Sequence, residues 1–312
     1  MSINSASILV TGGKGFVGRS LVKGLVGTGQ SVRIFSRTET KPDHPNISIF
    51  RGDLTCRRDL EAAVHGCKAI FHCAAEKTRA NLMTAVNVTA TQQLFEFAKR
   101  IGIGYFCHLS SVGVIGLPHV KLVDEGTPCN PTNQYEATKL AAEDIVREGL
   151  SHGKVVILRP TIILGAERLR PMLVRSLRSR AHTFLKGNEC AHFVYVDDVA
   201  AAAIHWMRAP ARNAVETFIV SSDEESGATY REIQEFLAFR FQVAPRPFKW
   251  SAPLWMPYWA RLMRDGKANY GDVVYSSQKI IGAGFRFPFG LAAGLREAAD
   301  LLLGSRNRGG FP

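Results

Sequence analysis

Short runs of β-branched and aromatic residues alternate with amphipathic segments over the first 165 residues of the chain. The runs predict strands at Ile8–Val10, Val32–Phe35, Ile47–Phe50, Ala69–His72, Tyr105–Leu109 and Val155–Leu158. The amphipathic segments predict helices at Phe16–Gly27, Arg57–Val64, Asn81–Arg100 and Asn133–Leu150. Strands that alternate with helices predict an α/β fold in which helices cover both faces of a doubly wound parallel sheet.

The pattern becomes irregular beyond residue 165. We therefore expect residues 1–165 to form the sheet domain and residues 166–312 to form mainly a smaller, mixed region. Within that region, residues 190–220 return to the sheet, beginning with a strand at Phe193–Val196.

An aromatic stretch, KWSAPLWMPYWARLM, occupies Lys249–Met263. Its residues Trp255, Trp259, Leu262 and Met263 recur at helical spacing, so one face of the predicted helix is strongly apolar. Three interpretations stay open. The helix packs on its own core, forms a lid over a substrate pocket, or contacts a membrane surface or a partner.

Composition narrows the class of protein. A chain of 312 residues with 46% hydrophobic composition fits one large domain or two interleaved ones. The six cysteines stand singly without a C-x-x-C pair, which is typical of reduced thiols in a cytosolic protein. No signal-peptide core and no apolar run of about 20 residues is present, so we expect a cytoplasmic protein without a membrane span. Nine histidines lack H-x-x-H spacing, so we expect no metal site.

The formal net charge of +12 raises the possibility of a nucleic-acid partner. Basic residues are spread along the chain rather than massed in a tail, so we expect none. Two interpretations of the densest cluster remain, a solvated helix face and a rim that attracts an anionic substrate. The cluster consists of Arg168, Arg170, Arg175, Arg178 and Arg180.

The first strand and helix are joined by a glycine-rich turn in the segment ILVTGGKGFVGRSLV at Ile8–Val22. The turn fits a dinucleotide-binding pattern through Gly12, Gly15 and Gly18, and it nearly fits a nucleoside-triphosphate loop. The triphosphate loop requires lysine where this chain has Arg19, whose planar guanidinium does not replace it readily. A turn that follows the first strand at once and opens a helix is the dinucleotide geometry.

The second predicted strand ends at Ser36-Arg37. An acidic residue at this position would bind the adenosine 2′-hydroxyl, whereas Arg37 offers paired donors to a 2′-phosphate. We therefore expect NADP to be preferred over NAD, with Lys14 as a second cation beside the phosphate.

Tyr135 and Lys139 are four residues apart in NQYEATKLAAE, so a helix places both on one face. An ammonium about 4 Å from a phenol lowers its pKa by roughly three units at an effective dielectric of 20. Tyr135 can then act as an acid or base near neutral pH. Ser111, at the end of the strand FCHLSS, would hydrogen-bond the reacting oxygen while hydride passes to or from the nicotinamide.

These motifs resemble the extended branch of the short-chain dehydrogenase/reductase family, the NAD(P)-dependent epimerase/dehydratase group, over nearly the whole chain. The resemblance implies a Rossmann-type NAD(P)-binding domain at residues 1–165 and a mainly substrate-binding region at 166–312. The other matching segments are GDL (Gly52–Leu54), HCAA (His72–Ala75), NVTAT (Asn87–Thr91), LRPTIILG (Leu158–Gly165) and FVYVDDVAAA (Phe193–Ala202).

The resemblance also implies the site residues. Ser111, Tyr135 and Lys139 align with the family's catalytic set. The expected cofactor contacts are Gly12, Gly15, Phe16, Val17, Gly18, Arg37, Asp53, Leu54, Ala74, Ala75, Lys77, Asn87, Tyr135, Lys139 and Pro160. Other interpretations are a helix cap for Asp53, a core histidine for His72, a surface charge for Lys77 and a turn former for Asn87.

The family relation favours a nucleotide-sugar substrate, acted on by an epimerase or 4-ketoreductase. Two departures weaken this expectation. Ala191-His192 stands where an arginine usually grips the diphosphate, and ERLRP at Glu167–Pro171 lacks the usual asparagine. The candidate substrate residues are Ser111, Arg168, Arg170, His192 and Trp255.

Arg37 and the aromatic stretch instead resemble dihydroflavonol-reductase-like and 3β-hydroxysteroid-dehydrogenase-like enzymes. The alternative function is therefore NADPH-dependent reduction of a bulky, non-sugar carbonyl. A catalytically silent NADP-binding sensor or scaffold is a third possibility. Related enzymes pair through the helices corresponding to Asn81–Arg100 and Asn133–Leu150, so the resemblance implies a homodimer.

Overall fold

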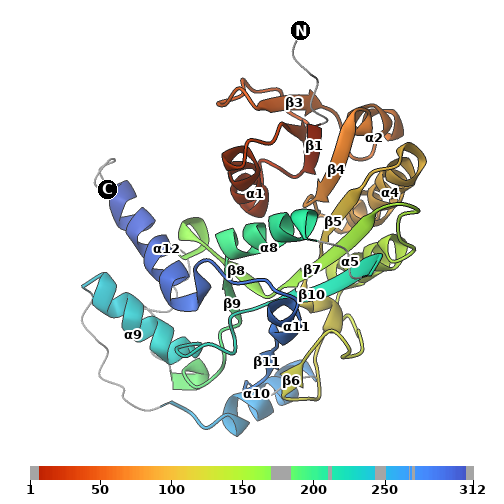
Figure 1. Ribbon diagram of the computed structural model, residues 1–312. Coiled ribbons are helices and arrows are strands. Elements are labelled where there is room, and N and C mark those ends of the chain that lie inside the picture. Colours follow the sequence, from red (N-terminus) through yellow and green to blue (C-terminus); the bar gives the residue numbers. More distant parts are fainter. Residues whose placement is uncertain are drawn as a thin grey trace. The chain divides into compact units, whose positions relative to one another are not determined.

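The computed structural model describes residues 7–169, 184–209, 213–242, 251–266, 268 and 271–306. A seven-stranded sheet with strand order β10-β7-β5-β4-β1-β2-β3 is its largest element (Figure 1). Across this sheet, each neighbouring pair from β7 through β5, β4, β1 and β2 to β3 is parallel. The strands are β1 (Ser7–Thr11), β2 (Val32–Ser36), β3 (Ile47–Arg51), β4 (Cys67–His72), β5 (Tyr105–Leu109), β7 (Lys154–Pro160) and β10 (Val215–Val220). The predicted doubly wound parallel sheet is confirmed.

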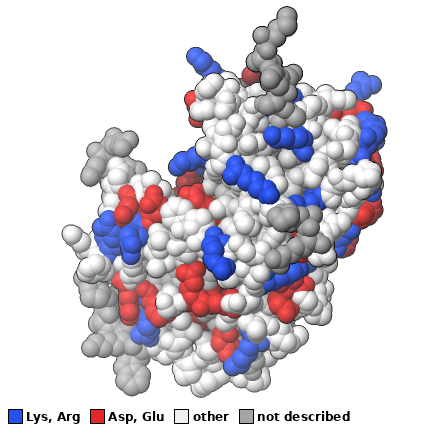
Figure 2. All heavy atoms as spheres, viewed as in Figure 1, with Lys and Arg blue, Asp and Glu red and all other residues white. Residues whose placement is uncertain are grey.

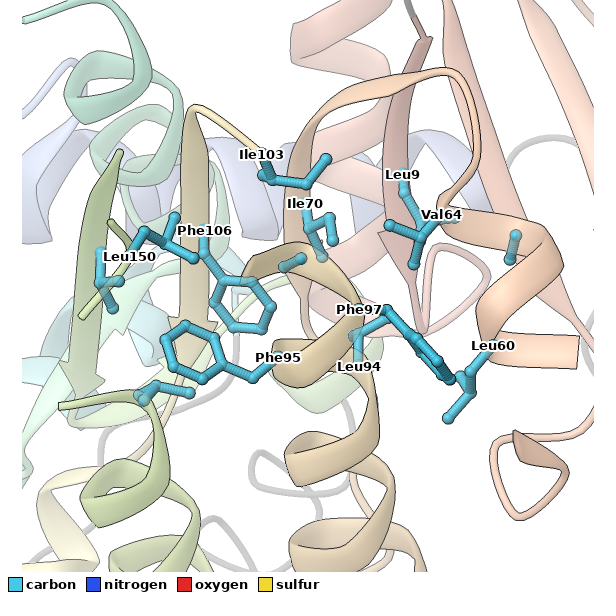
Figure 3. Packing of buried hydrophobic residues seen from close by; sticks show 14 of the residues in the cluster. Leu9, Leu60, Val64, Ile70, Leu94, Phe95, Phe97, Ile103, Phe106 and Leu150 are labelled. Atoms are coloured by element: carbon cyan, nitrogen blue, oxygen red, sulfur yellow. The ribbon is translucent and has the colours of Figure 1, made fainter. Parts of the chain in front are cut away.

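Helices on one face of the sheet close a continuous apolar core. The helices of this face are α2 (Arg57–Val64), α4 (Ala90–Ile101) and α5 (Gln134–Val146). Phe95 of α4 and Phe106 of β5 point toward one another with ring centroids 5.1 Å apart, edge to face (Figure 3). The amphipathic spacing of α4 produces this packing, because Leu94, Phe95 and Ala98 fall on its inner side.

The opposite face is covered by α1 (Phe16–Gly27) and the body of α8 (Val196–Arg208). The hydroxyl of Tyr105 in β5 donates to the carbonyl oxygen of Ala203 in α8 at 2.8 Å. Gly24 of α1 meets Ile204 of α8 so closely that a Cβ at Gly24 would lie 2.7 Å from its side chain. Coverage of both faces explains why β7 is buried along its whole length.

The predicted helix at residues 81–100 is divided in three. It consists of α3 (Ala80–Met83), a π-helical segment η1 (Thr84–Thr89) and α4. The widened turn contains Asn87, which is buried with 1% exposure. Periodicity alone did not reveal this segment, because a single π-helical turn leaves the spacing of apolar residues nearly unchanged.

The chain forms two compact units. The first contains residues 1–116, 128–160 and 199–218, and the second contains residues 117–127, 161–198 and 219–312. Residues 190–220 differ from expectation in one respect. β10 joins the large sheet, but β9 (Phe193–Tyr195) pairs in parallel with β8 (Ile162–Leu164) in a separate two-stranded sheet.

The second unit also contains a two-stranded sheet of β6 (Leu122–Val123) and β11 (Val274–Tyr275). Among the residues that the structure describes, this unit also contains the helices α9 (Tyr230–Arg240), α10 (Trp255–Asp265), α11 (Gln278–Gly282) and α12 (Gly290–Arg306). Both carboxylate oxygens of Asp198 accept hydrogen bonds at 2.9 Å, from the backbone N–H groups of Phe289 and Gly290. Asp198 thereby satisfies donors at the start of α12.

The surface carries mixed charge on the face drawn in Figure 2. Lys and Arg side chains are interspersed with Asp and Glu there, and the described residues on that face form no continuous basic area. None of the described helices has the length and apolar character that crossing a membrane requires.

Candidate active site

At Gly12, in the turn between β1 and α1, and at Gly18, in the first turn of α1, there is no room for a side chain. Gly12 has a φ of +69°, and a Cβ on it would lie 2.8 Å from the backbone nitrogen of Ala74. A Cβ on Gly18 would lie 2.1 Å from the carbonyl oxygen of Gly12. The first turn of α1, with Phe16 and Val17, follows Gly15 directly and carries no acidic residue. This cradle fits a dinucleotide pyrophosphate, because the backbone N–H groups and the helix dipole favour an anion.

Two cations lie where β2 ends. Lys14 of the glycine turn donates from Nζ to the carbonyl oxygen of Thr38 at 2.7 Å. Arg37, the residue before Thr38, is exposed. Hydrogen bonds from Thr55 lower the pKa of the Asp53 carboxyl, and the Arg37 guanidinium lowers it further. Arg37 and Asp53 therefore share one neighbourhood, as a site for the adenosine end of a dinucleotide requires.

Asp53 shapes its own loop. Its Oδ1 accepts from the backbone nitrogen of Thr55 at 2.8 Å and from the Thr55 hydroxyl at 2.7 Å. It caps a turn just ahead of α2 rather than the helix itself, whose N-cap is Cys56. The next residue, Leu54, packs partly buried against the core of the first unit.

Asn87 ties the loop after β4 to α5. Its amide donates to the carbonyl oxygen of Glu76 at 2.9 Å and to Thr138 Oγ1 at 3.0 Å, while its Oδ1 accepts from the Glu76 nitrogen at 2.7 Å. The loop so held contains Ala74, Ala75 and Lys77. The Lys77 ammonium lies 5.4 Å from the ring centroid of Tyr135, close enough for a cation–π interaction. Asn87 is thus a fixed bridge and not merely a turn former.

The predicted catalytic residues belong to elements of the first unit. Ser111 follows β5 and caps the short 3₁₀ helix η2 (Val112–Ile115), where its Oγ accepts from Gly113 N at 3.1 Å. Its hydroxyl hydrogen remains available to donate. Tyr135 and Lys139 lie one turn apart on α5, Tyr135 partly exposed and Lys139 only 1% exposed. Pro160 ends β7, the strand beside β5, and is buried.

Lys139 reaches a buried histidine pair that the sequence did not single out as functional. Its Nζ lies 3.1 Å from Nε2 of His108 in β5, and His108 is register partner to His72 in β4. His72 is held by Thr11 at 2.7 Å and by Thr91 at 2.8 Å, so the core-histidine interpretation of His72 is confirmed. Burial is the main cause that lowers the pKa of both histidines, and the positive charge of Lys139 is the second. The pKa of His72 falls to about 3, and that of His108 falls well below its usual value. Both imidazoles are therefore neutral.

Burial also acts on Lys139 itself, whose pKa falls from 10.5 to about 8. The nearby Glu143 carboxylate opposes this fall, and the Lys77 charge adds to it. Lys139 is still charged at neutral pH, one helical turn from Tyr135.

A buried ion pair fixes the other side of α5. Glu143 is fully buried and accepts from Arg159 of β7 at 2.7 Å, and it also accepts from Ser110, the residue before Ser111. Arg147 forms a second, partly exposed pair with Glu143. These bonds join α5 to β7 and to the end of β5, next to Ser111 in the chain.

The expected substrate residues other than Ser111 belong to the second unit or lie outside the described residues. Arg168 is exposed in a helical turn after β8, and Arg170 lies outside the described residues. His192 pairs with Asp223, with Nδ1 and Oδ2 2.6 Å apart. Burial lowers the pKa of His192, but hydrogen bonds to Asp223 and Cys190 outweigh burial and raise it to about 9. The charge of His192 is already balanced by Asp223.

The sequence leaves three interpretations of Lys249–Met263 open, and the one in which its helix packs on its own core is wrong for Trp255, Trp259 and Met263. Trp255 and Trp259 of α10 are 59% and 50% exposed, and Met263 is 83% exposed. The residue of α10 that is buried is Pro257. Periodicity identified one apolar face but could not say whether another part of the chain covers it.

Comparison with known proteins identifies the family of the chain. The model of the NAD dependent epimerase/dehydratase family matches residues 8–220. The chain is 32% identical over 213 residues to the sterol demethylase protein B of Methylococcus capsulatus, covering 63% of this chain and 64% of that protein. It is 29% identical over 232 residues to the human sterol-4-alpha-carboxylate 3-dehydrogenase, decarboxylating, covering 69% of this chain and 62% of that enzyme. The chain thus spans less than two thirds of the length of these relatives.

Solved structures share the fold. The UDP-glucose 4-epimerase of Thermus thermophilus, solved in complex with NAD, superposes with a TM-score of 0.70 at 24% identity. The match covers 96% of this chain and 99% of the epimerase. The fold, the glycine turn and the family match lead to one conclusion. The chain belongs to the NAD dependent epimerase/dehydratase family, whose members are NAD(P)-dependent oxidoreductases of the extended short-chain dehydrogenase/reductase type.

Proposed function

We propose that this chain interconverts a secondary alcohol and a ketone with NADP(H), using Tyr135 as the acid–base residue. The observation that carries the proposal is the burial of Lys139 one helical turn from Tyr135, with its charge kept inside the protein at an energetic cost. A charge held there at such a cost is typical of a functional site.

Each residue of the proposed site would have a separate role in the reaction. Ser111 would donate its hydroxyl hydrogen to the reacting oxygen, since its lone pair already accepts from Gly113. Tyr135 would take the proton of the alcohol or return it to the ketone oxygen. Lys139 and Lys77 would stabilise the phenolate through their positive charges. A bound NAD(P) supplies the hydride chemistry.

The glycine turn, Asp53 and the loop that holds Ala74 would bind the dinucleotide. We propose NADP(H) rather than NAD(H), because Arg37 and Lys14 offer two cations at the end of β2. Arg37→Glu should weaken NADPH binding by about 10- to 100-fold, the loss of a hydrogen bond to a charged group, and leave NADH binding nearly unchanged. Arg58→Glu, the same charge change at an exposed position of α2, is the control. Equal affinities of the parent protein for NADPH and NADH would contradict this preference.

For the substrate we propose a bulky, apolar alcohol or ketone rather than a nucleotide sugar. Two curated relatives are named as sterol proteins, whereas the nucleotide-sugar epimerase resembles this chain in fold at 24% identity. The His192 charge is balanced by Asp223, which leaves it poorly suited to grip a diphosphate. A nucleotide sugar remains the second candidate, favoured by the exposed Arg168.

The test is Tyr135→Phe, which removes one oxygen and keeps the ring. NADP⁺ reduction would be followed with two substrate probes, a 3β-hydroxysteroid and a UDP-hexose. We expect turnover of the steroid by the parent protein and a loss of about 10²- to 10⁴-fold in the variant. NADPH binding should stay within about tenfold. Unchanged turnover in Tyr135→Phe would refute the mechanism, and binding without turnover of either probe would favour the silent sensor.

A further inference from the structure

Three side chains of the second unit that could bind a metal ion converge, and none of them has a role in the proposed hydride transfer. Among the residues that the structure describes, Cys190, His192 and Asp223 form one such group. One ligand atom from each lies within 4.8 Å of the other two. Cys190 and His192 are two residues apart in the sequence, but Asp223 comes from the turn after β10, so no short sequence motif predicts the group.

The backbone holds each of the three donors in place. The Cys190 nitrogen donates to the carbonyl oxygen of Gly271 at 2.8 Å, in an isolated antiparallel bridge region with Thr229. Asp223 Oδ2 accepts from the backbone nitrogen of Tyr275 at 3.0 Å. His192 has a φ of +54°, a left-handed conformation that is uncommon for a residue other than glycine. Such conformations persist where the surroundings enforce them, often at binding sites.

A second, independent observation points to a missing ligand. The Asp223 side chain is fully buried, and its Oδ1 has no hydrogen-bond partner among the described residues. His192 Nδ1 and the Tyr275 amide both approach the other oxygen, Oδ2. A buried carboxylate oxygen without a partner is costly, and a cation would satisfy it.

We propose that Cys190, His192 and Asp223 bind a divalent cation of the zinc type. Thiolate and imidazole ligands favour Zn²⁺ over Mg²⁺ or Ca²⁺, which require oxygen ligands. Tetrahedral zinc places donor atoms roughly 3.3–3.6 Å apart. His192 Nδ1 and Asp223 Oδ2, now 2.6 Å apart, would therefore separate slightly and release the proton between them when the ion binds. His192 is 21% exposed and Cys190 is partly buried, which leaves a fourth position for water.

Zn²⁺ itself is the probe. Full-length protein, treated with a chelator and kept reduced, would be titrated with Zn²⁺ against a chromophoric competitor, and in parallel with Co²⁺. We expect one equivalent to bind, and Co²⁺ to give the charge-transfer band of a single thiolate ligand together with tetrahedral d–d bands. Cys190→Ser, which nearly preserves size, should abolish the charge-transfer band and weaken Zn²⁺ binding at least about tenfold. Asp223→Asn should weaken it similarly.

Cys56→Ser is the matched control, because Cys56 is also a partly buried free thiol but lies in the first unit. It should leave the band and the affinity unchanged, and circular dichroism should show every variant folded. The proposal is overturned by a failure to bind one equivalent of Zn²⁺, or by a thiolate band that survives in Cys190→Ser. Neither measurement involves turnover, so the result is independent of the redox proposal.

Discussion

The ammonium nitrogen of Lys139 lies 3.1 Å from Nε2 of His108, and both side chains are buried between α5 and β5. An ammonium can only donate, so His108 Nε2 is the acceptor and its ring hydrogen is on Nδ1. That Nδ1 has no partner among the described residues. Burial keeps the pKa of His108 well below its usual value, so the imidazole stays neutral and continues to accept.

His108→Phe should move the alkaline loss of turnover to lower pH. The variant removes the acceptor that stabilises the charged form of Lys139, so the pKa of Lys139 should fall below its present value of about 8. Tyr135 would then lose its activating charge at a lower pH. The check is kcat measured against pH, with His108→Gln, which can still accept, restoring the parent profile. An identical profile in His108→Phe would show that His108 only fills space.

Lys139→Met should stabilise the protein at neutral pH while abolishing turnover. Because burial lowers the pKa of Lys139 from 10.5 to about 8, the unfolded chain binds this proton more tightly than the folded chain. At pH 7 this difference costs up to about 3 kcal/mol, and the cost fades as the pH rises from about 8 to 10.5. Urea unfolding should therefore show a gain for Lys139→Met at pH 7 that is nearly absent above pH 10. A gain of equal size at both pH values would assign it to packing instead.

Glu143→Gln should destabilise the first unit severely. Glu143 and Arg159 are 0% and 2% exposed, and loss of the carboxylate leaves a buried guanidinium without its counter-charge. Breaking such a pair costs about 3–5 kcal/mol. Glu148→Gln is the control on the same stretch of chain, since its partner Lys99 is 36% exposed and such a pair contributes at most about 1 kcal/mol. Similar unfolding free energies for the two variants would contradict the assigned role of Glu143.

Two glycine substitutions in α1 should have opposite effects. Gly18→Ala places a Cβ 2.1 Å from the backbone oxygen of Gly12, and relieving that clash should cost about 1–3 kcal/mol and distort the turn that binds the dinucleotide. Gly27→Ala, in the last turn of the same helix, meets nothing within 4 Å. It should add roughly 0.4–1 kcal/mol. Thermal unfolding with and without NADPH measures both effects, and tight NADPH binding by Gly18→Ala would show that the turn adapts.

The parallel sheet and its helices could be predicted because the signals are local. The alternation of apolar runs with amphipathic segments predicted strands β1, β2, β3, β4, β5 and β7 and helices α1, α2 and α5 to within a few residues, whereas the short strand β6 was not predicted. The glycine turn could be predicted too, since the spacing of Gly12, Gly15 and Gly18 is local and the crowding at Gly18 comes from the turn's own backbone. Helical spacing likewise placed Tyr135 and Lys139 one turn apart.

What the sequence determined by itself was therefore the kind of fold, the dinucleotide turn and the spacing of Tyr135 and Lys139. Only the tertiary structure decided which partners those residues meet. It brought His108 to Lys139 across β5 and α5, placed Asp223 against His192, and left Trp255 exposed instead of packed. The two contacts join residues far apart in the chain, and the exposure of Trp255 depends on which distant residues cover it. Periodicity carries no information about distant residues, because it compares only neighbours along one helix or strand.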